Sequence, residues 1–152
     1  MVVQITDRAE KAAVARRILE NLTDWFGVDE SRERYIDESR EQRMFADLAG
    51  GAPRGFLCLK PTGADTVELA VMGVLPEFHR QGIGAALFAA ERRAAAEEGF
   101  SFLQVKTVRS GVFPEYDRTN RFYRSLGFRE FEVLPTLWDE KNPCQIYVMY
   151  LR

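Results

Sequence analysis

The chain has 152 residues, of which 46% are hydrophobic and 29% are charged, values typical of a soluble globular protein. This length favours a single domain over residues 1–152 rather than two domains. The 21 basic and 23 acidic residues give a net charge of −2. Because the basic residues also form no run, the sequence does not indicate a nucleic-acid partner.

The two cysteines, Cys58 and Cys144, lie far apart in apolar stretches and form no C-x-x-C pair. Both are predicted to be reduced core residues without a metal site, with a reactive thiol at Cys144 as the alternative. The residues around Val2–Ile5 lack the regions of a signal peptide. No apolar run is long enough to span a membrane. We therefore expect a cytoplasmic protein with no membrane partner and no metal.

The first elements are predicted from hydrophobic periodicity. Val2–Ile5 indicates a strand, and Thr6-Asp7 after it offers two side chains that can cap a helix. From Arg8 to Leu22, apolar residues recur at three- and four-residue spacings, which predicts an amphipathic helix. A second helix, rich in charge, is predicted from Ser31 to about Arg40.

Three strands are predicted next, at Met44–Leu48, Gly55–Leu59 and Thr66–Val74. The turn residues Gly50-Gly51-Ala52-Pro53 indicate that the first two strands form a hairpin. Gly73 lies near the end of the third strand. An isolated glycine there predicts a bulge or a close approach of another segment.

The second half predicts a long alanine-rich helix stopped by Gly99, then a strand, a helix and two further strands. These elements are Ile83–Glu98, Phe102–Thr107, Tyr116–Leu126, Phe128–Leu134 and Cys144–Leu151. A long connection with two prolines and Trp138 is expected between the last two strands. The order predicts a mixed α/β sheet rather than a doubly wound parallel one.

The most informative segment joins the strand Thr66–Val74 to the helix that starts near Ile83. A helix N-terminus presents unpaired N–H groups and the positive end of a dipole. Gly82 and Gly84 would let a bulky anion approach the backbone, and Arg80 adds a positive charge. The segment therefore predicts a phosphate cradle, with a simple tight turn into a helix as the alternative.

Two other phosphate-binding loops do not fit these residues. A Walker loop requires a Gly-Lys-Ser/Thr sequence, which is not present here. A dinucleotide fingerprint requires a third small residue where Leu87 stands. It also requires an acidic residue at the tip of the next strand, where Lys106-Thr107-Val108 stands.

The loop sequence His79-Arg80-Gln81-Gly82-Ile83-Gly84 resembles the pyrophosphate-binding motif of the GNAT superfamily of N-acetyltransferases, Gln/Arg-x-x-Gly-x-Gly/Ala. The family's frequent Val-x-Pro-Glu precedes it. His79 departs from the motif, and its expected role is in loop structure. The segment Tyr123-Arg124-Ser125-Leu126-Gly127-Phe128 looks like a second family signature, Tyr-x-x-x-Gly-Phe.

The resemblance implies a mixed central sheet of about seven strands with helices on both faces. It also implies that acetyl-CoA, the co-substrate, lies where two parallel strands, Thr66–Val74 and Phe102–Thr107, splay apart. The pantetheine arm would pair with the first of these strands. The implied cofactor-binding residues are Met72, Gly73, Val74, His79, Arg80, Gln81, Gly82, Ile83, Gly84 and Ala85.

Two catalytic residues follow from the resemblance. Tyr123 occupies the position of the general acid that protonates the leaving CoA thiolate, with packing under Gly127-Phe128 as its alternative role. Glu68 is the candidate base that deprotonates the amine, with a salt bridge or a surface position as its alternative. Water chains serve as the base in many relatives.

The implied reaction is acetyl transfer to a primary amine of a small molecule. A protein or peptide acetyltransferase and a non-catalytic acyl-CoA-binding module are the alternatives, and a homodimer is plausible from the family. The candidate substrate residues come from the first helices and the C-terminal part of the chain: Trp25, Phe26, Tyr35, Tyr116 and Trp138.

Overall fold

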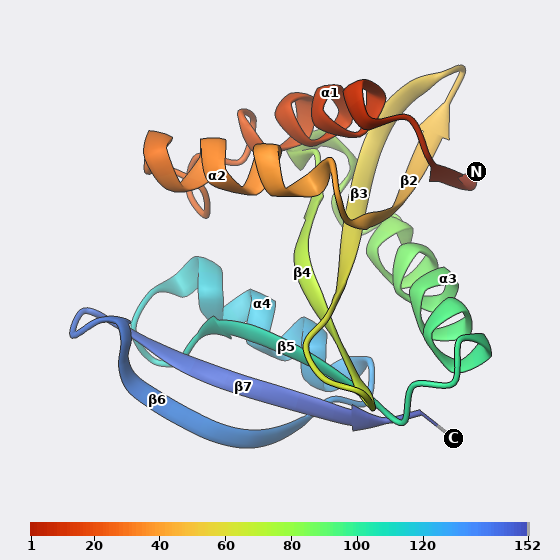
Figure 1. The fold of residues 1–152 in the computed structure, drawn as a ribbon. Coiled ribbons are helices and arrows are strands. Elements are labelled where there is room, and N and C mark those ends of the chain that lie inside the picture. The colour runs from red at the N-terminus through yellow and green to blue at the C-terminus, as the bar shows by residue number, and fades with distance from the viewer. Residues whose placement is uncertain (152) are drawn as a thin grey trace. The chain divides into compact units, whose positions relative to one another are not determined.

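A computed structural model describes residues 1–151 of the chain, which form two compact units. The first unit comprises Met1–Lys60 and Leu69–Ala94, and the second comprises Pro61–Glu68 and, of the described residues, 95–151. Within the described residues, seven strands form one sheet in the order β1-β2-β3-β4-β5-β7-β6 (Figure 1). The predicted mixed α/β fold is confirmed.

The first unit contains β1, α1, α2, β2 and most of β3, β4 and α3. The bounds are β1 Val2–Ile5, α1 Arg8–Leu19, α2 Asp29–Ser39, β2 Arg43–Ala49, β3 Ala52–Pro61, β4 Thr66–Val74 and α3 Ile83–Glu97, with a short 3-10 helix, η1, at Pro76–Phe78. The described pairs β1–β2 and β2–β3 are antiparallel.

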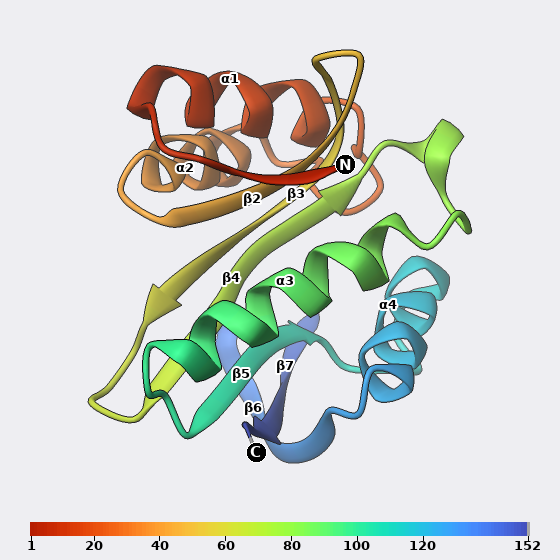
Figure 2. The same cartoon turned by 90° about the vertical axis from the view of Figure 1, so that its right-hand side faces the viewer.

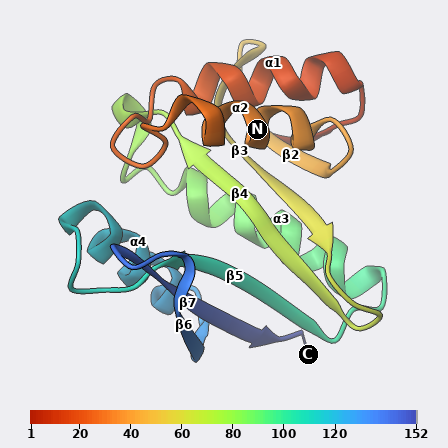
Figure 3. The same ribbon diagram turned by 60° about the vertical axis from the view of Figure 1, so that its left-hand side comes forward.

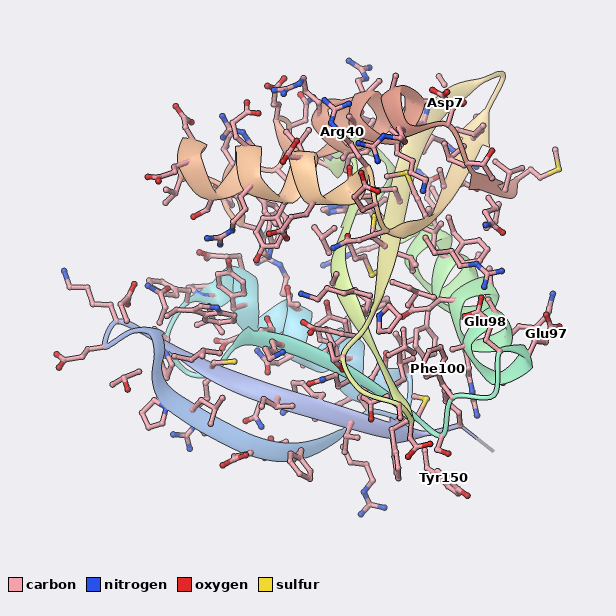
Figure 4. All side chains as sticks on the ribbon, in the orientation of Figure 1. Asp7, Arg40, Glu97, Glu98, Phe100 and Tyr150 are labelled. Carbon is pink, nitrogen blue, oxygen red and sulfur yellow. The ribbon has the colours of Figure 1, made fainter. Side chains whose placement is uncertain are left out.

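Helix α1 begins and ends for local reasons. Its N-cap is Asp7, whose carboxylate accepts a hydrogen bond from Glu10 N (Figure 4). The helix ends at Leu19, three residues before the predicted end, because the chain tightens into a turn with bonds from Asn21 N to Ile18 O and from Leu22 N to Leu19 O. Leu22 is nevertheless buried.

The predicted hairpin between β2 and β3 is confirmed, and its turn has only two residues. Gly50 and Gly51 have φ angles of 57° and 83°, and Ala49 pairs with Ala52 directly across the turn. A two-residue hairpin turn with positive φ at both positions matches the twist of the strands, and glycine adopts it without a steric penalty.

Helices cover both faces of the sheet in the first unit. Figure 2 shows α1 and α2 on one side of β2, β3 and β4, and α3 in front of β4 on the other side. A Cβ atom at Gly73 would lie 2.7 Å from Leu22 Cδ1 and 2.9 Å from Ile18 Cγ2, so α1 packs directly on the β4 backbone. On the other face, a Cβ at Gly55 would meet Ile83 of α3 at 3.2 Å. The close approach predicted at Gly73 is therefore present.

The second unit contains β5 (Phe102–Val108), α4 (Pro114–Ser125), β6 (Arg129–Asp139) and β7 (Asn142–Tyr150). Strand β7 pairs antiparallel with both β5 and β6, and α4 lies along one face of these strands (Figure 3). Gly127 follows α4 with a φ of 103°, which ends the helix as predicted.

The long connection predicted between the last two strands is wrong. Strand β6 continues past Pro135 to Asp139, and β7 starts at Asn142. The Asp139 carboxylate closes the turn by accepting hydrogen bonds of 2.9 Å from Lys141 N and from Asn142 N. Pro135 is tolerated because β6 is the terminal strand of the sheet, where a missing N–H disrupts no further pairing.

A membrane-crossing helix was not expected. Within residues 1–151, no helix combines the length and the apolar character that crossing a membrane requires.

A buried carboxyl group stands out in the first unit. Glu91 of α3 is fully buried, and neither of its carboxyl oxygens has a hydrogen-bond partner within residues 1–151. Desolvation by burial raises the pKa of Glu91 well above its usual range. The folded protein therefore binds the Glu91 proton more tightly than the unfolded chain does.

This linkage predicts that Glu91 destabilises the fold as the pH rises. Above the unfolded pKa of about 4.3, the folded state binds more protons than the unfolded state, so the free energy of unfolding falls with pH up to the raised folded pKa. Glu91→Gln should match the parent protein near pH 4 and become the more stable of the two as the pH rises to 8, because glutamine does not ionise. Urea unfolding at both pH values measures this, and parallel pH dependences would contradict it.

Candidate active site

The connection from β4 to α3 turns sharply in the first unit. After η1, His79 is extended, Arg80 has a φ of 63°, and Gly82 has a φ of 80°. Ala86 N then bonds to Gly82 O at 3.0 Å, which closes the first turn of α3. The N–H groups of the residues just before Ala86 come too early to bond within the helix. They therefore form the positively polarised end of α3.

Gly82 leaves room above this helix end. A Cβ atom built on Gly82 would meet no heavy atom of the described residues within 4 Å. The glycine is therefore required by its positive φ and not by protein packing around it. Open space beside unpaired N–H groups is the geometry of an anion-binding concavity.

The side chains of His79 and Gln81 bond back to the loop, whereas Arg80 is exposed. His79 Nε2 lies 2.7 Å from Val74 O at the end of β4, and Gln81 Nε2 donates to Glu77 O at 3.4 Å. The His79 ring also meets the Trp25 ring edge-to-face, with centroids 6.1 Å apart. These contacts hold the loop in shape and leave its cation at Arg80 facing solvent.

Three predicted cofactor residues lie at the end of β4. Gly73 is buried against α1, and alternation along the strand turns Met72 and Val74, both half-buried, to the opposite face. Further along the loop, Ile83 is buried, Gly84 is half-buried and Ala85 is exposed at the start of α3.

Tyr123 lies in the second unit among aromatic rings. Its side chain is buried, and its ring centroid is 5.8 Å from that of Phe128, 5.8 Å from that of Phe122 and 6.1 Å from that of Tyr147. The predicted packing of Tyr123 under the Gly127-Phe128 segment is therefore present. This packing involves the ring of Tyr123, so it does not determine what the hydroxyl group does.

Glu68, also in the second unit, is buried and paired. Its Oε1 accepts a hydrogen bond from Lys106 Nζ at 3.0 Å, so the salt bridge considered from the sequence exists. Sequence reasoning did not identify Lys106 as this partner, because it comes 38 positions later on a different strand.

The cysteines are free and buried, as predicted. Burial raises the pKa of Cys58 to about 12 and also raises the pKa of Cys144. Because only the thiolate is strongly nucleophilic, these environments do not favour the alternative of a reactive thiol at Cys144. Within the part of the chain that the structure describes, no group of three or more His, Cys, Asp or Glu side chains could hold a metal ion.

The candidate substrate residues fall into two groups. Trp25, Phe26 and Tyr35 are partly buried against the core of the first unit, and the rings of Phe26 and Tyr35 meet edge-to-face at 5.6 Å. In the second unit, Tyr116 is half-buried on α4, and Trp138 is 42% exposed on β6 rather than in a loop. The structure thus pairs Phe26 with Tyr35 and packs Trp25 against the same core.

Comparison with known proteins identifies the family. Residues 40–130 match the acetyltransferase (GNAT) domain, which is more than half of the chain. A GNAT-family protein from Desulfovibrio desulfuricans has a similar structure, with a TM-score of 0.86 and 22% identity over 100% of both chains. No match with curated protein sequences reaches significance.

Two other solved structures share the fold. The ribosomal-protein-S18-alanine N-acetyltransferase from Escherichia coli has a TM-score of 0.77 and 18% identity, over 99% of this chain and 94% of that one. An aminoglycoside 6'-N-acetyltransferase, solved with coenzyme A, has a TM-score of 0.76 and 16% identity, over 100% and 97%. The chain belongs to the GNAT acetyltransferase family, so it is an acyltransferase, and the implied fold is confirmed.

The left-handed conformation at Arg80 predicts a difference between two substitutions. A residue with a Cβ atom in this region costs roughly 1 kcal/mol relative to glycine. Arg80→Ala keeps the strain, whereas Arg80→Gly relieves it, and both remove the same charge. Arg80→Gly should therefore be more stable than Arg80→Ala by about 1 kcal/mol in urea unfolding, and equal stabilities would contradict the strain.

Proposed function

We propose that the protein is an N-acetyltransferase that moves the acetyl group of acetyl-CoA to a primary amine of a small molecule by direct attack. The observation that carries the proposal is the loop before α3, in a chain of the GNAT family. In this loop, Arg80 and Gly82 have positive φ angles, and the space beside Gly82 is open.

The residues of the loop fit a pyrophosphate group. Successive N–H groups at the start of α3 and the exposed Arg80 guanidinium supply donors and positive charge, and the absence of a side chain at Gly82 leaves room. His79 supports the fit, since its bond to Val74 O stabilises the loop without occupying that space. We therefore assign acetyl-CoA binding to this loop and to the end of β4, at Met72, Gly73 and Val74.

The chemistry needs a proton acceptor for the amine and a proton donor for sulfur. The amine nitrogen attacks the thioester carbon, the carbon–sulfur bond breaks, and the Tyr123 hydroxyl gives its proton to the leaving sulfur. Glu68 accepts the proton of the amine, directly or through water. The Lys106 ammonium group, 3.0 Å from Glu68 Oε1, holds this side chain in place.

The acceptor is proposed to be a small amine because the aromatic side chains of α2 and of the segment between α1 and α2 offer flat surfaces for contact with one. Phe26 and Tyr35 form an edge-to-face pair, and Arg32 Nη1 holds the Phe26 carbonyl at 2.9 Å. Structural relatives act on an aminoglycoside in one case and on a ribosomal protein in another. A protein or peptide substrate is therefore the second candidate.

We also propose that the protein is cytoplasmic. Cys58 and Cys144 are both free and buried, which suits a reducing compartment. A homodimer is proposed with β6 as the pairing edge, since β6 ends the strand order and exposes Phe131 and Leu137. Light scattering on the purified protein measures whether it is a dimer.

The reaction itself is tested by measuring CoA release from acetyl-CoA with a panel of amines, amino acids and peptides. Release with one class of small amine supports the proposal, whereas release with peptides alone supports the second candidate. If acetyl-CoA binds but no acceptor releases CoA, the chain is an acyl-CoA-binding module. If acetyl-CoA does not bind, the proposed function is wrong.

Substitution of Gly82 tests the cradle. Gly82→Val places a branched side chain in the open space and forces it into a left-handed backbone, so acetyl-CoA affinity should fall at least about 100-fold. Isothermal titration measures this, with Gly63→Val as the control. Gly63 also lies in open space but belongs to the β3–β4 turn. Unchanged affinity in Gly82→Val would refute the cradle.

Substitution of Tyr123 tests the general acid. Tyr123→Phe keeps the packing with Phe128 and Tyr147 but removes the hydroxyl proton. We expect turnover to fall roughly 100-fold while acetyl-CoA affinity stays within twofold. Steady-state kinetics and titration measure the two quantities. Equal turnover in the two proteins would remove Tyr123 from the mechanism.

A further inference from the structure

A chain of hydrogen bonds crosses the interior of the second unit and links α4 to β5 and β7. Asn120 of α4 is fully buried, and its Nδ2 donates to Val108 O at 2.8 Å and to Tyr116 O at 2.6 Å. Its Oδ1 accepts a hydrogen bond of 2.6 Å from Tyr147 Oη on β7. Arg124 Nη1 donates to the same Tyr147 oxygen at 3.3 Å.

The direction of each bond makes this chain specific for its residues. An amide side chain has two donor hydrogens and an acceptor oxygen, and Asn120 uses both ends. A carboxylate could accept from Tyr147 but could not donate to Val108 O. An apolar side chain would leave the Tyr147 hydroxyl and the Val108 carbonyl without these partners, which is costly in a buried site.

The same residues surround Tyr123. Asn120 lies three positions before Tyr123 on α4, so the two side chains share one face of the helix. Tyr147 joins them, because its ring contacts the Tyr123 ring while its hydroxyl is bonded to Asn120. Rotation of the Tyr147 ring would therefore break a buried hydrogen bond and also move a ring that packs against Tyr123.

We propose that Tyr147 and Asn120 are positioning residues for the Tyr123 hydroxyl. The proposal rests on the proposed function, in which Tyr123 protonates the leaving sulfur. Tyr147 fixes the Tyr123 ring from the side, and Asn120 fixes both Tyr147 and the segment of α4 that carries Tyr123. Since proton transfer depends on the placement of the donor, small displacements of this hydroxyl reduce turnover before they reduce binding.

A double-mutant cycle separates positioning from simple stabilisation. Tyr147→Phe removes only the hydroxyl and should lower kcat about tenfold, with acetyl-CoA affinity within twofold. In a Tyr123→Phe background, the same substitution should change kcat less than twofold, because the group to be positioned is absent. Equal losses of kcat in the two backgrounds, or no loss in either, would overturn the proposal. Tyr150→Phe is the matched control, since Tyr150 lies on β7 with an exposed side chain.

The cycle also distinguishes failure of the inference from failure of the proposed function. If Tyr123→Phe alone leaves kcat unchanged, the proposed general acid is wrong, and the positioning role is wrong with it. If Tyr123→Phe is impaired but the losses are additive, only the positioning role is wrong. Should Tyr147→Phe not fold, Arg124→Met replaces it in the cycle, because Arg124 is partly exposed and bonds to the same hydroxyl. Arg124→Met should then lower kcat two- to threefold when Tyr123 is present and leave kcat unchanged in the Tyr123→Phe background.

Discussion

The left-handed backbone between β4 and α3 is the constraint on which the rest of the candidate site depends. Arg80 and Gly82 both adopt positive φ angles, and this conformation is what lets α3 begin beside open space. A strained residue such as Arg80 persists only where its surroundings hold it. The hydrogen bond from His79 to the end of β4 supplies such a contact, so the departure from the family motif at His79 preserves the loop.

Packing on the opposite side of β4 reinforces this loop within the first unit. Because Gly73 has no side chain, Ile18 and Leu22 reach the strand backbone, and α1 lies close to the sheet. The chain then leaves α1 through a tight turn that brings Trp25 to the His79 ring. A glycine in the strand thus determines where the aromatic contact on the loop can form.

Local patterns made much of the fold predictable. The glycines at 50 and 51 predicted the hairpin, and the glycine motif predicted the loop into α3. Strand β6 was predicted too short because Pro135 and the polar residues near it read as a loop, while an exposed terminal strand tolerates both. The partners Lys106 of Glu68 and Tyr147 of Asn120 could not be predicted, since these pairs join residues 38 and 27 positions apart.

The buried polar groups of the two units differ in whether hydrogen bonds fix their orientation. Asn120 and Tyr147 satisfy each other in a directional chain, and such a chain has one low-energy geometry. Glu91 has no partner within residues 1–151, so burial imposes a cost on it but no orientation. A group without a fixed orientation cannot place a proton at a reacting atom. The bonded residues around Tyr123, unlike the isolated carboxyl of α3, therefore have the fixed orientation that placing a proton requires.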